Sequence, residues 1–376
     1  MTRSAVVQQR IASGRARRGW RDRLGLLLPI TVALLFFAGL ALRVGSTDGY
    51  RFYRAIAVGS LFEDPSLLPA DLKPAPTVGL DGQFYYYIAQ DPFLRNPYTA
   101  RALDNNLRYR RILYPLLAWL LSGGRRGLLP YVLIAINVVA CTAVAAAAAV
   151  ASRRAGQTAW LALAVAIFPG VWVSLTRDMT EPLQLALATW GLLLESALLL
   201  FLSSLAKETT AIVQLTEGIR NLVGGRMRPA ARNLLLLALL LGWALAVSLF
   251  VHAHSSNLTA QFLDPPWAPF SLLLQSTSNP ALYACLVPNL AICLLAVARL
   301  ARTRDRYALA AGAYAVVGIL AGNTTWIDPF AEFRITALAG VLVFMSWVSA
   351  RDRMGAVVVM LMLLTGVLGL AVALLP

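Results

Sequence analysis

The chain of 376 residues is 59% hydrophobic and only 14% charged, and its mean hydropathy is +0.66. A water-soluble domain carries about 25% charged residues, so this composition excludes an ordinary soluble protein. The net charge of +15 does not indicate a nucleic-acid partner, because the arginines form short clusters between apolar runs, where they set membrane topology. We therefore expect an all-α integral membrane protein.

About nine transmembrane helices are expected, because a helix needs about 20 apolar residues to cross the hydrocarbon core. The apolar runs lie at 24–44, 128–151, 157–175, 182–205, 233–252, 280–300, 307–322, 335–350 and 354–375. Residues 1–23 are rich in arginine and are expected to form a cytoplasmic N-terminus, followed by one polytopic domain, 24–376, in the cell (inner or plasma) membrane. Nine crossings place all the short basic segments in the cytoplasm, at 153–154, 220–232, 302–306 and 351–353.

The run 182–205 contains a charged residue, Glu195, and such a charge costs roughly 2.5–3.5 kcal/mol on insertion scales. Two crossings would need about 40 residues, so the run is expected to form a single span. Glu195 then either faces a polar interior or marks a break in the helix. The same count places Lys207 on the cytoplasmic side.

Residues 45–127 form the largest expected extracytoplasmic loop. Within it, Asp81 is a good helix N-cap and Pro92 disfavours helix at its end, which predicts a helix of about ten residues, too short to span. The four aromatic residues from Phe84 to Tyr87 cannot all face one core, so this helix is expected to lie flat at headgroup level. Asp81 is then either a simple cap or a functional carboxylate at the water–lipid boundary.

A second short element follows at 108–119, where three arginines precede an apolar segment that is again too short to cross. The arginines are Arg108, Arg110 and Arg111. Guanidinium groups match the geometry of phosphate, and they would contact either lipid headgroups or a phosphorylated substrate. The loop therefore predicts a carboxylate and a phosphate-binding site at one membrane face.

These segments resemble the GT-C superfamily of polytopic glycosyltransferases, and most nearly its GPI-mannosyltransferase branch. The run Asp81-Gly82-Gln83-Phe84-Tyr85 is similar to the Trp-Asp-x-x-Trp-Tyr run of that branch, and Tyr114-Pro115-Leu116-Leu117 is similar to its Phe-Pro-Leu-Tyr-Pro-Leu stretch. Asp178-Met179-Thr180-Glu181-Pro182-Leu183 resembles its Ser-Glu-Pro-Leu, and Lys207-Glu208-Thr209-Thr210 its Thr-Arg-Pro-Thr segment. The resemblance covers roughly residues 20–210.

The chain departs from this family pattern at three points. Gly79-Leu80 stands where the family has a tryptophan before the aspartate, and the stretch from Glu181 to Lys207 is about one span shorter than expected. In the family, the Thr-Arg-Pro-Thr segment lies near the outer face, whereas nine spans place Lys207 inside.

The resemblance implies the inverting transfer of a sugar from a polyprenyl-phosphate donor to a glycan, lipid or protein acceptor outside the membrane. Asp81 would be the general base, with Asp48 as the alternative. The proposed contacts to substrate and phosphate are Arg108, Arg110, Arg111, Arg334, Tyr85, Asp178 and Glu181. No cofactor and no metal ligands are implied, although a divalent cation stays an open alternative.

Several of these residues also have simpler interpretations. Arg334 would serve equally as an anchor whose charged end reaches the headgroups, and Asp178 and Glu181 as acids that favour a helix N-terminus. The competing functions are a polytopic transporter, for which Glu195 suits a coupling-ion role, and a non-catalytic relative of the glycosyltransferases, which the shortened 182–207 region suggests.

Overall fold

The computed structural model describes residues 3–70, 72–253, 268–274, 280–303, 305–321, 326, 328–350 and 354–374. Within these residues the fold is helical, and an isolated bridge pairs Gly59 with Ala75. The long helices are α1 (Arg3–Ser46), α7 (Leu129–Arg154), α13 (Met227–Phe250), α15 (Pro280–Arg302), α18 (Pro329–Ala350) and α19 (Met354–Leu374). The helices of intermediate length are α10 (Glu181–Leu193), α11 (Ala197–Ala206), α12 (Ala211–Val223) and α16 (Arg306–Ile319).

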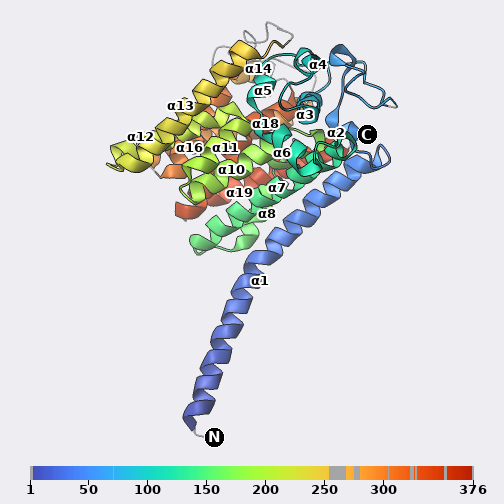
Figure 1. The fold of residues 1–376 in the computed structure, drawn as a ribbon. Coiled ribbons are helices and arrows are strands. Elements are labelled where there is room, and N and C mark those ends of the chain that lie inside the picture. The colour runs from blue at the N-terminus through green and yellow to red at the C-terminus, as the bar shows by residue number, and fades with distance from the viewer. Residues whose placement is uncertain are drawn as a thin grey trace.

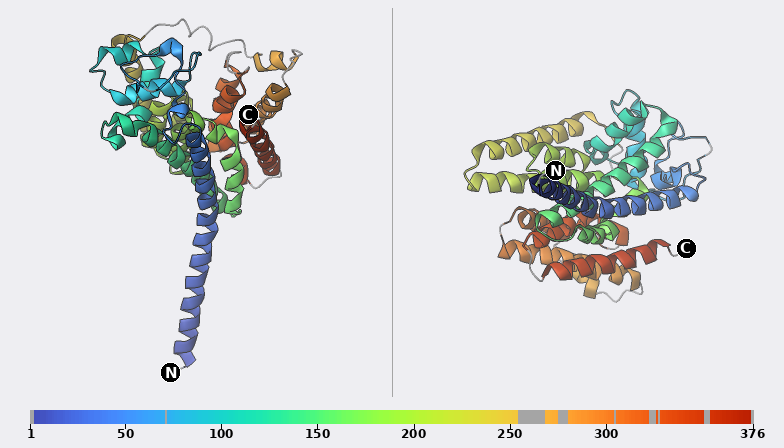
Figure 2. Two further views of the ribbon diagram at one scale, coloured as in Figure 1. Left: turned by 90° about the vertical axis from the view of Figure 1, so that its right-hand side faces the viewer. Right: turned by 90° about the horizontal axis from the view of Figure 1, so that it is seen from below.

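The remaining helices are short, and most lie between α1 and α7. They are α2 (Tyr53–Ile56), η1 (Ser60–Phe62), α3 (Asp81–Gln90), α4 (Pro97–Arg101), α5 (Leu107–Arg110), α6 (Leu113–Ser122), η2 (Arg126–Leu128), η3 (Ala159–Leu161), α8 (Ala162–Ile167), α9 (Pro169–Trp172), η4 (Leu175–Arg177), η5 (Glu208–Thr210) and α14 (Ala268–Leu274). Helices α2 to α5 gather at one end of the bundle, whereas the N-terminal part of α1 extends far beyond the opposite end (Figures 1 and 2).

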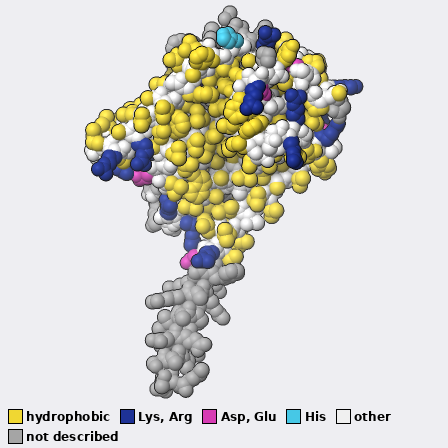
Figure 3. Space-filling view, in the orientation of Figure 1, with side chains coloured by type: hydrophobic (Ala, Val, Ile, Leu, Met, Phe, Trp, Pro, Cys, Tyr) yellow, Lys and Arg dark blue, Asp and Glu magenta, His cyan; other side chains and the backbone are white. Residues whose placement is uncertain are grey.

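Six of the described helices are long and apolar enough to cross a membrane. They are Asp22–Ser46, Arg126–Arg154, Met227–Phe250, Ala284–Arg302, Ala331–Ala350 and Met354–Ala371. Figure 3 shows a broad hydrophobic belt, with lysines and arginines gathered at the tip of α12 and over the short helices at the other end. The chain is therefore a multi-pass membrane protein. Length and composition support six or seven spans among the described residues, fewer than the nine expected. Two of the basic segments predicted to be cytoplasmic include residues outside the described part, namely 304 and 351–353.

A seventh candidate span is broken in the middle. Residues Ala159–Ile167 and Pro169–Arg177 meet at an angle of 69°. The break is at Phe168, whose extended backbone (ψ 121°) is the conformation that a following proline imposes. The indole Nε1 of Trp172 donates to the Ile167 carbonyl at 2.9 Å, which satisfies a carbonyl that the broken helix would otherwise leave without a partner.

The prediction of one span over 182–205 is wrong, because this segment folds into a hairpin of two helices, α10 and α11. The turn is at Glu195, whose φ is +55°, and the Ser196 hydroxyl caps α11 by accepting from the Leu199 amide. A Cβ on Gly191 would lie 3.2 Å from the Leu200 backbone nitrogen, so the two helices pack closely. Glu195 therefore marks a break, the second of its two expected roles. At 1.5 Å per residue, α10 is about 20 Å long and α11 about 15 Å long, so neither helix is long enough to cross the membrane. Most of α10 is buried in protein.

This hairpin also corrects the placement of Lys207. Because the chain reverses at Glu195, Lys207 returns to the start of α10, and its Nζ lies 2.8 Å from Glu181 Oε1. Lys207 therefore lies at the end of the bundle that carries the short helices, and the nine-span count that separated it from them is wrong. At the opposite end, Glu195 pairs with Arg226 and Arg306.

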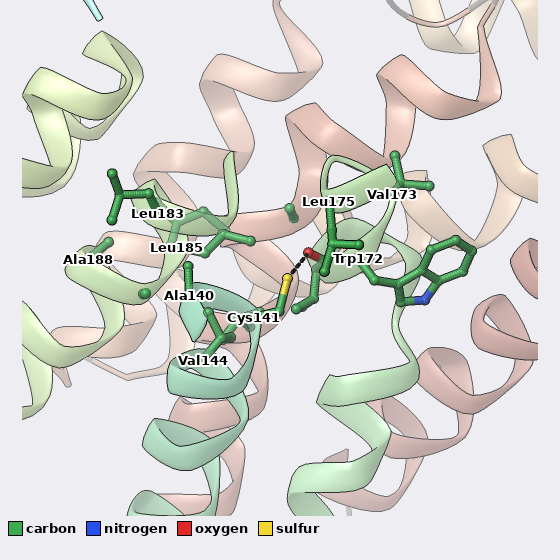
Figure 4. Packing of buried hydrophobic residues seen from close by; sticks show 14 of the residues in the cluster. Ala140, Cys141, Val144, Trp172, Val173, Leu175, Leu183, Leu185 and Ala188 are labelled. Carbon is green, nitrogen blue, oxygen red and sulfur yellow. Dashed lines mark hydrogen bonds between the residues drawn. The ribbon is translucent and has the colours of Figure 1, made fainter. Parts of the chain in front are cut away.

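The core around α7 mixes small side chains, such as Ala140 and Cys141, with large ones. Figure 4 shows Cys141 of α7 among Val144, Leu185 and Trp172, with its thiol donating to the Val171 carbonyl at 3.1 Å. All three cysteines, Cys141, Cys285 and Cys293, are free and buried. This packing fixes α7 against α9 and α10, so the loops at the end of these helices have a rigid support.

The sequence predicts that the aromatic helix α3 lies flat at headgroup level. In the structure this helix is instead buried in protein. All four aromatic side chains from Phe84 to Tyr87 are at most 3% exposed. They pack edge-on or tilted against rings from elements on different sides of α3, including Phe62 and Tyr114. The four rings can all be buried because the 45–127 segment wraps around the helix. A single buried face, which the prediction from the sequence requires, therefore does not apply to α3.

Candidate functional site

Asp81, the first residue of α3, is surrounded by arginines from distant parts of the chain. Its Oδ2 lies 2.8 Å from Arg108 Nη1 and 2.9 Å from Arg334 Nη2. Arg111 approaches the same oxygen at 3.6 Å. The N-cap of α3 is Leu80, and the Asp81 side chain makes no capping bond there, so the simple capping role is wrong. The expected convergence of Asp81 with arginines is confirmed.

Each of these arginines also binds a second carboxylate. Arg108 pairs with Asp104 (2.7 Å), Arg334 with Glu181 (2.7 Å) and Arg111 with Glu208 (2.6 Å). Glu181 in addition binds Lys207. We call this network the Asp81 cluster: Asp81, Asp104, Arg108, Arg111, Glu181, Lys207, Glu208 and Arg334. Its four cations and four anions balance in charge, which explains how so many ionic groups can be held at low exposure.

The cluster is partly open: Glu208 is its most exposed carboxylate at 33%, and Asp81 is also reached by solvent. The side chains of Asp81 and Arg334 are 17% and 18% exposed, whereas Glu181 is only 1% exposed. Burial alone would raise the pKa of the Asp81 carboxyl, but the charges of Arg108, Arg334 and Arg111 outweigh it and hold this pKa well below its usual range. Asp81 is therefore ionised and available to a ligand, but its basicity is suppressed while the arginines stay bound to it.

Tyr85 connects the cluster to the aromatic packing beneath it. Its hydroxyl accepts from Arg111 Nη1 at 3.1 Å, and its ring packs edge-on against Tyr114. The Tyr114 hydroxyl in turn accepts from the Asn137 amide at 2.9 Å. Tyr85 is fully buried, so in this structure its hydroxyl holds the Arg111 guanidinium in position by a hydrogen bond.

Three predicted site residues do not join the ion pairs of the Asp81 cluster. Arg110 points to α13, where its Nη2 donates to the Ser248 hydroxyl at 2.7 Å. Asp48 accepts from the backbone amides of Phe52 and Arg54 and lines a separate cavity of about 350 Å³. Asp178 is fully buried, no described residue donates to its carboxyl oxygens, and burial raises its pKa well above the usual range.

Three members of the cluster, Asp104, Lys207 and Glu208, are not among the site residues predicted from the sequence. Asp104 had a local signal, since a carboxylate four residues before Arg108 favours an ion pair on one turn. Lys207 was misplaced by the span count. Glu208 could be assigned only from the fold, because its partner Arg111 is 97 residues away.

The position of Asp81 depends on a close approach at Gly82. A Cβ on Gly82 would lie 2.5 Å from the Arg177 carbonyl oxygen and 3.0 Å from that of Ile56. We expect Gly82→Ala to displace the first turn of α3 and to cost about 1–3 kcal/mol of stability, measured as a lower midpoint of thermal unfolding in detergent. Gly242→Ala is the matched control, because nothing lies within 4 Å of that Cβ. Equal midpoints for both variants would refute the close contact.

The Glu208–Arg111 pair predicts a pH dependence of stability. Burial alone would raise the pKa of Glu208, but Arg111 outweighs it and lowers this pKa from 4.5 to about 2. A carboxyl with a lowered pKa stabilises the fold above its unfolded value and loses this effect as the pH falls. The difference in unfolding midpoint between wild type and Glu208→Gln is therefore expected to be constant above about pH 5 and to shrink toward pH 2. A difference that grows on acidification would contradict this pairing.

Comparison of the chain with protein-family models, with characterised proteins and with solved structures finds no match in any of the three.

Proposed function

We propose that this chain is a membrane glycosyltransferase that moves a sugar from a polyprenyl-phosphate donor to an extracytoplasmic acceptor with inversion. The observation that carries the proposal is the partly exposed Asp81 carboxylate, held by Arg108 and Arg334 at one end of a membrane-embedded bundle. A carboxylate beside several guanidinium groups supplies both a base for a hydroxyl and donors for a phosphate. In this proposal the N-terminus is cytoplasmic.

The chemistry follows from these two kinds of group. Asp81 takes the proton of the acceptor hydroxyl, whose oxygen forms a bond to the anomeric carbon of the donor sugar. The bond from that carbon to the phosphate oxygen breaks, and the lipid phosphate leaves with the electron pair. Arg108 and Arg334 stabilise the charge that develops on the phosphate. Because the donor phosphate competes with Asp81 for these arginines, its binding would restore the basicity that Asp81 lacks in the free protein.

The structure removes the argument from Glu195 for a transporter. Glu195 lies at the α10–α11 turn, 48% exposed and paired with arginines, not within a span where a coupling ion would bind. The Asp81 cluster lies at one end of α10, which fits an enzyme whose reacting acids and arginines gather at one membrane face.

The test is to incubate the purified protein with radiolabelled polyprenyl-phosphate sugars and membrane acceptors and to identify the labelled product. Transfer with inverted anomeric configuration is the expected result. Binding of the lipid donor without transfer to any acceptor would favour the non-catalytic relative instead, and no binding at all would remove the proposal.

A further inference from the structure

A second charged site lies at the end of the bundle opposite the Asp81 cluster. The α10–α11 turn, the α12–α13 turn and the start of α16 meet around a cavity of about 190 Å³. The length of α10, about 20 Å at 1.5 Å per residue, separates this cavity from the Asp81 cluster. We call it the Glu195 cavity; its charged and amide side chains are Glu195, Glu217, Asn221, Arg226, Arg232, Asn233 and Arg306.

Ion pairs fix the walls of the Glu195 cavity. Arg306 binds Glu195 at 2.9 Å and Glu217 at 2.7 Å, and so joins α16 to the hairpin turn and to α12. Arg226 closes the other side, with its Nη2 2.8 Å from Glu195. These ion pairs connect the α10–α11 turn, the end of the α12–α13 hairpin and the start of α16. The walls of the cavity are therefore held in place by the fold itself.

The cavity has cationic groups that the carboxylates do not neutralise. Arg232 lines it, and no described residue forms an ion pair or hydrogen bond with the Arg232 side chain. Three buried polar atoms on its wall also have no partner among the described residues: Arg306 Nε, Asn221 Oδ1 and Asn233 Oδ1. These three atoms are closed off from solvent, so Arg232 is the group that suits the cavity to a ligand with an anionic group.

The surroundings of the cavity are those of a lipid boundary. The α12–α13 tip exposes apolar side chains beside the arginines, with Val223 83% and Met227 63% exposed, and Figure 3 shows this mixture of hydrophobic and basic side chains at the tip of α12. From the cavity, α13 continues with two exposed leucines on the same side of the helix as Arg232, Leu235 and Leu239. An acyl chain could lie along them while its headgroup occupies the cavity.

We propose that the Glu195 cavity binds the phosphate of an anionic glycerophospholipid from the adjoining leaflet. Arg232 and Arg226 contact the phosphate. The site is independent of sugar transfer, because it shares no residue with the Asp81 cluster. Its effect is to tie the ends of α11, α12 and α16 together through a bound lipid.

The test compares Arg232→Gln with Arg228→Gln in the purified full-length protein titrated with phosphatidylglycerol in detergent. Arg228 is an exposed arginine on the same helix that does not line the cavity. Phosphatidylglycerol is expected to raise the unfolding midpoint of wild type and Arg228→Gln alike. Arg232→Gln is expected to bind it roughly tenfold more weakly, since it loses a charge-assisted hydrogen bond. Equal binding by the two variants would overturn the proposal.

Two further arms identify the source of the phosphate. Phosphatidylcholine, which has no net charge, is expected to give a smaller increase that does not depend on Arg232. Glycerol phosphate, the soluble headgroup, is expected to give none at millimolar concentration; an increase equal to that of the lipid would assign the site to a soluble phosphate and refute the lipid. Arg226→Gln provides a second test of the same site should Arg232→Gln fail to fold, and unchanged lipid binding there would also count against the proposal.

Discussion

Asp81→Asn is expected to lower the rate of sugar transfer by roughly 10²- to 10⁴-fold, the usual contribution of a general base, while the protein stays folded. The fold should survive because each arginine around Asp81 keeps a second carboxylate in the variant. Asparagine is also nearly the same size as aspartate and keeps one oxygen as an acceptor. The measurement is the initial rate of product formation from a labelled polyprenyl-phosphate sugar, with the unfolding midpoint as the check on folding.

Asp104→Asn is the matched control for this experiment. It removes the other carboxylate bound to Arg108 (2.7 Å) but leaves the proposed base in place. If Asp81 acts only by holding arginines, the two variants should lower the rate by similar factors. If Asp81 is the base, Asp104→Asn should keep most of the activity. Full activity in Asp81→Asn would exclude Asp81 from the mechanism altogether.

The largest loss of stability is expected for Glu181→Gln. Glu181 Oε1 binds both Lys207 and Arg334 within 2.8 Å, and the Glu181 and Lys207 side chains are only 1% and 7% exposed. Removing one partner of a buried ion pair leaves the other charge uncompensated, which costs about 3–5 kcal/mol. The free energy of unfolding in mixed micelles, or the thermal midpoint in detergent, measures this loss.

A double variant separates this electrostatic cause from a loss of shape. Glu181→Gln combined with Lys207→Met removes the buried cation together with its anion, so we expect it to regain much of the lost stability. Arg334 keeps Asp81 as its partner in this variant. A double variant less stable than Glu181→Gln alone would show that Lys207 stabilises the fold by contacts other than this pair.

The local chemistry of the site was accessible from the sequence. Asp81 and Arg108 lie on short elements too brief to span, so their placement together at one face followed from length and charge, and the contact at 2.8 Å agrees with it. The first helix and the long apolar spans could also be predicted from the sequence, because a run of about 20 apolar residues has the length of a transmembrane helix. Arg334 was only one of several candidates, since its contact with Asp81 joins residues 253 positions apart.

Two features could not be predicted from the sequence because protein, and not lipid, surrounds them. The length of the 182–205 run predicts one crossing, yet α10 is buried in protein and need not match the membrane thickness. Aromatic side chains all around a short helix predict a headgroup position for Phe84 to Tyr87, yet these rings are buried in protein. In both cases, neighbouring segments cover surfaces that periodicity alone would leave exposed to lipid.

The contact between Asp81 and Arg334 also has a consequence for biogenesis. At translation rates of about 5–20 residues per second, the 253 residues between them take roughly ten to fifty seconds to synthesise. During that time Asp81 and Arg108 have already left the ribosome, whereas α18 has not yet entered the translocon. The charged centre is therefore incomplete in the nascent protein, and Asp81 lacks its Arg334 partner until the last helices are inserted.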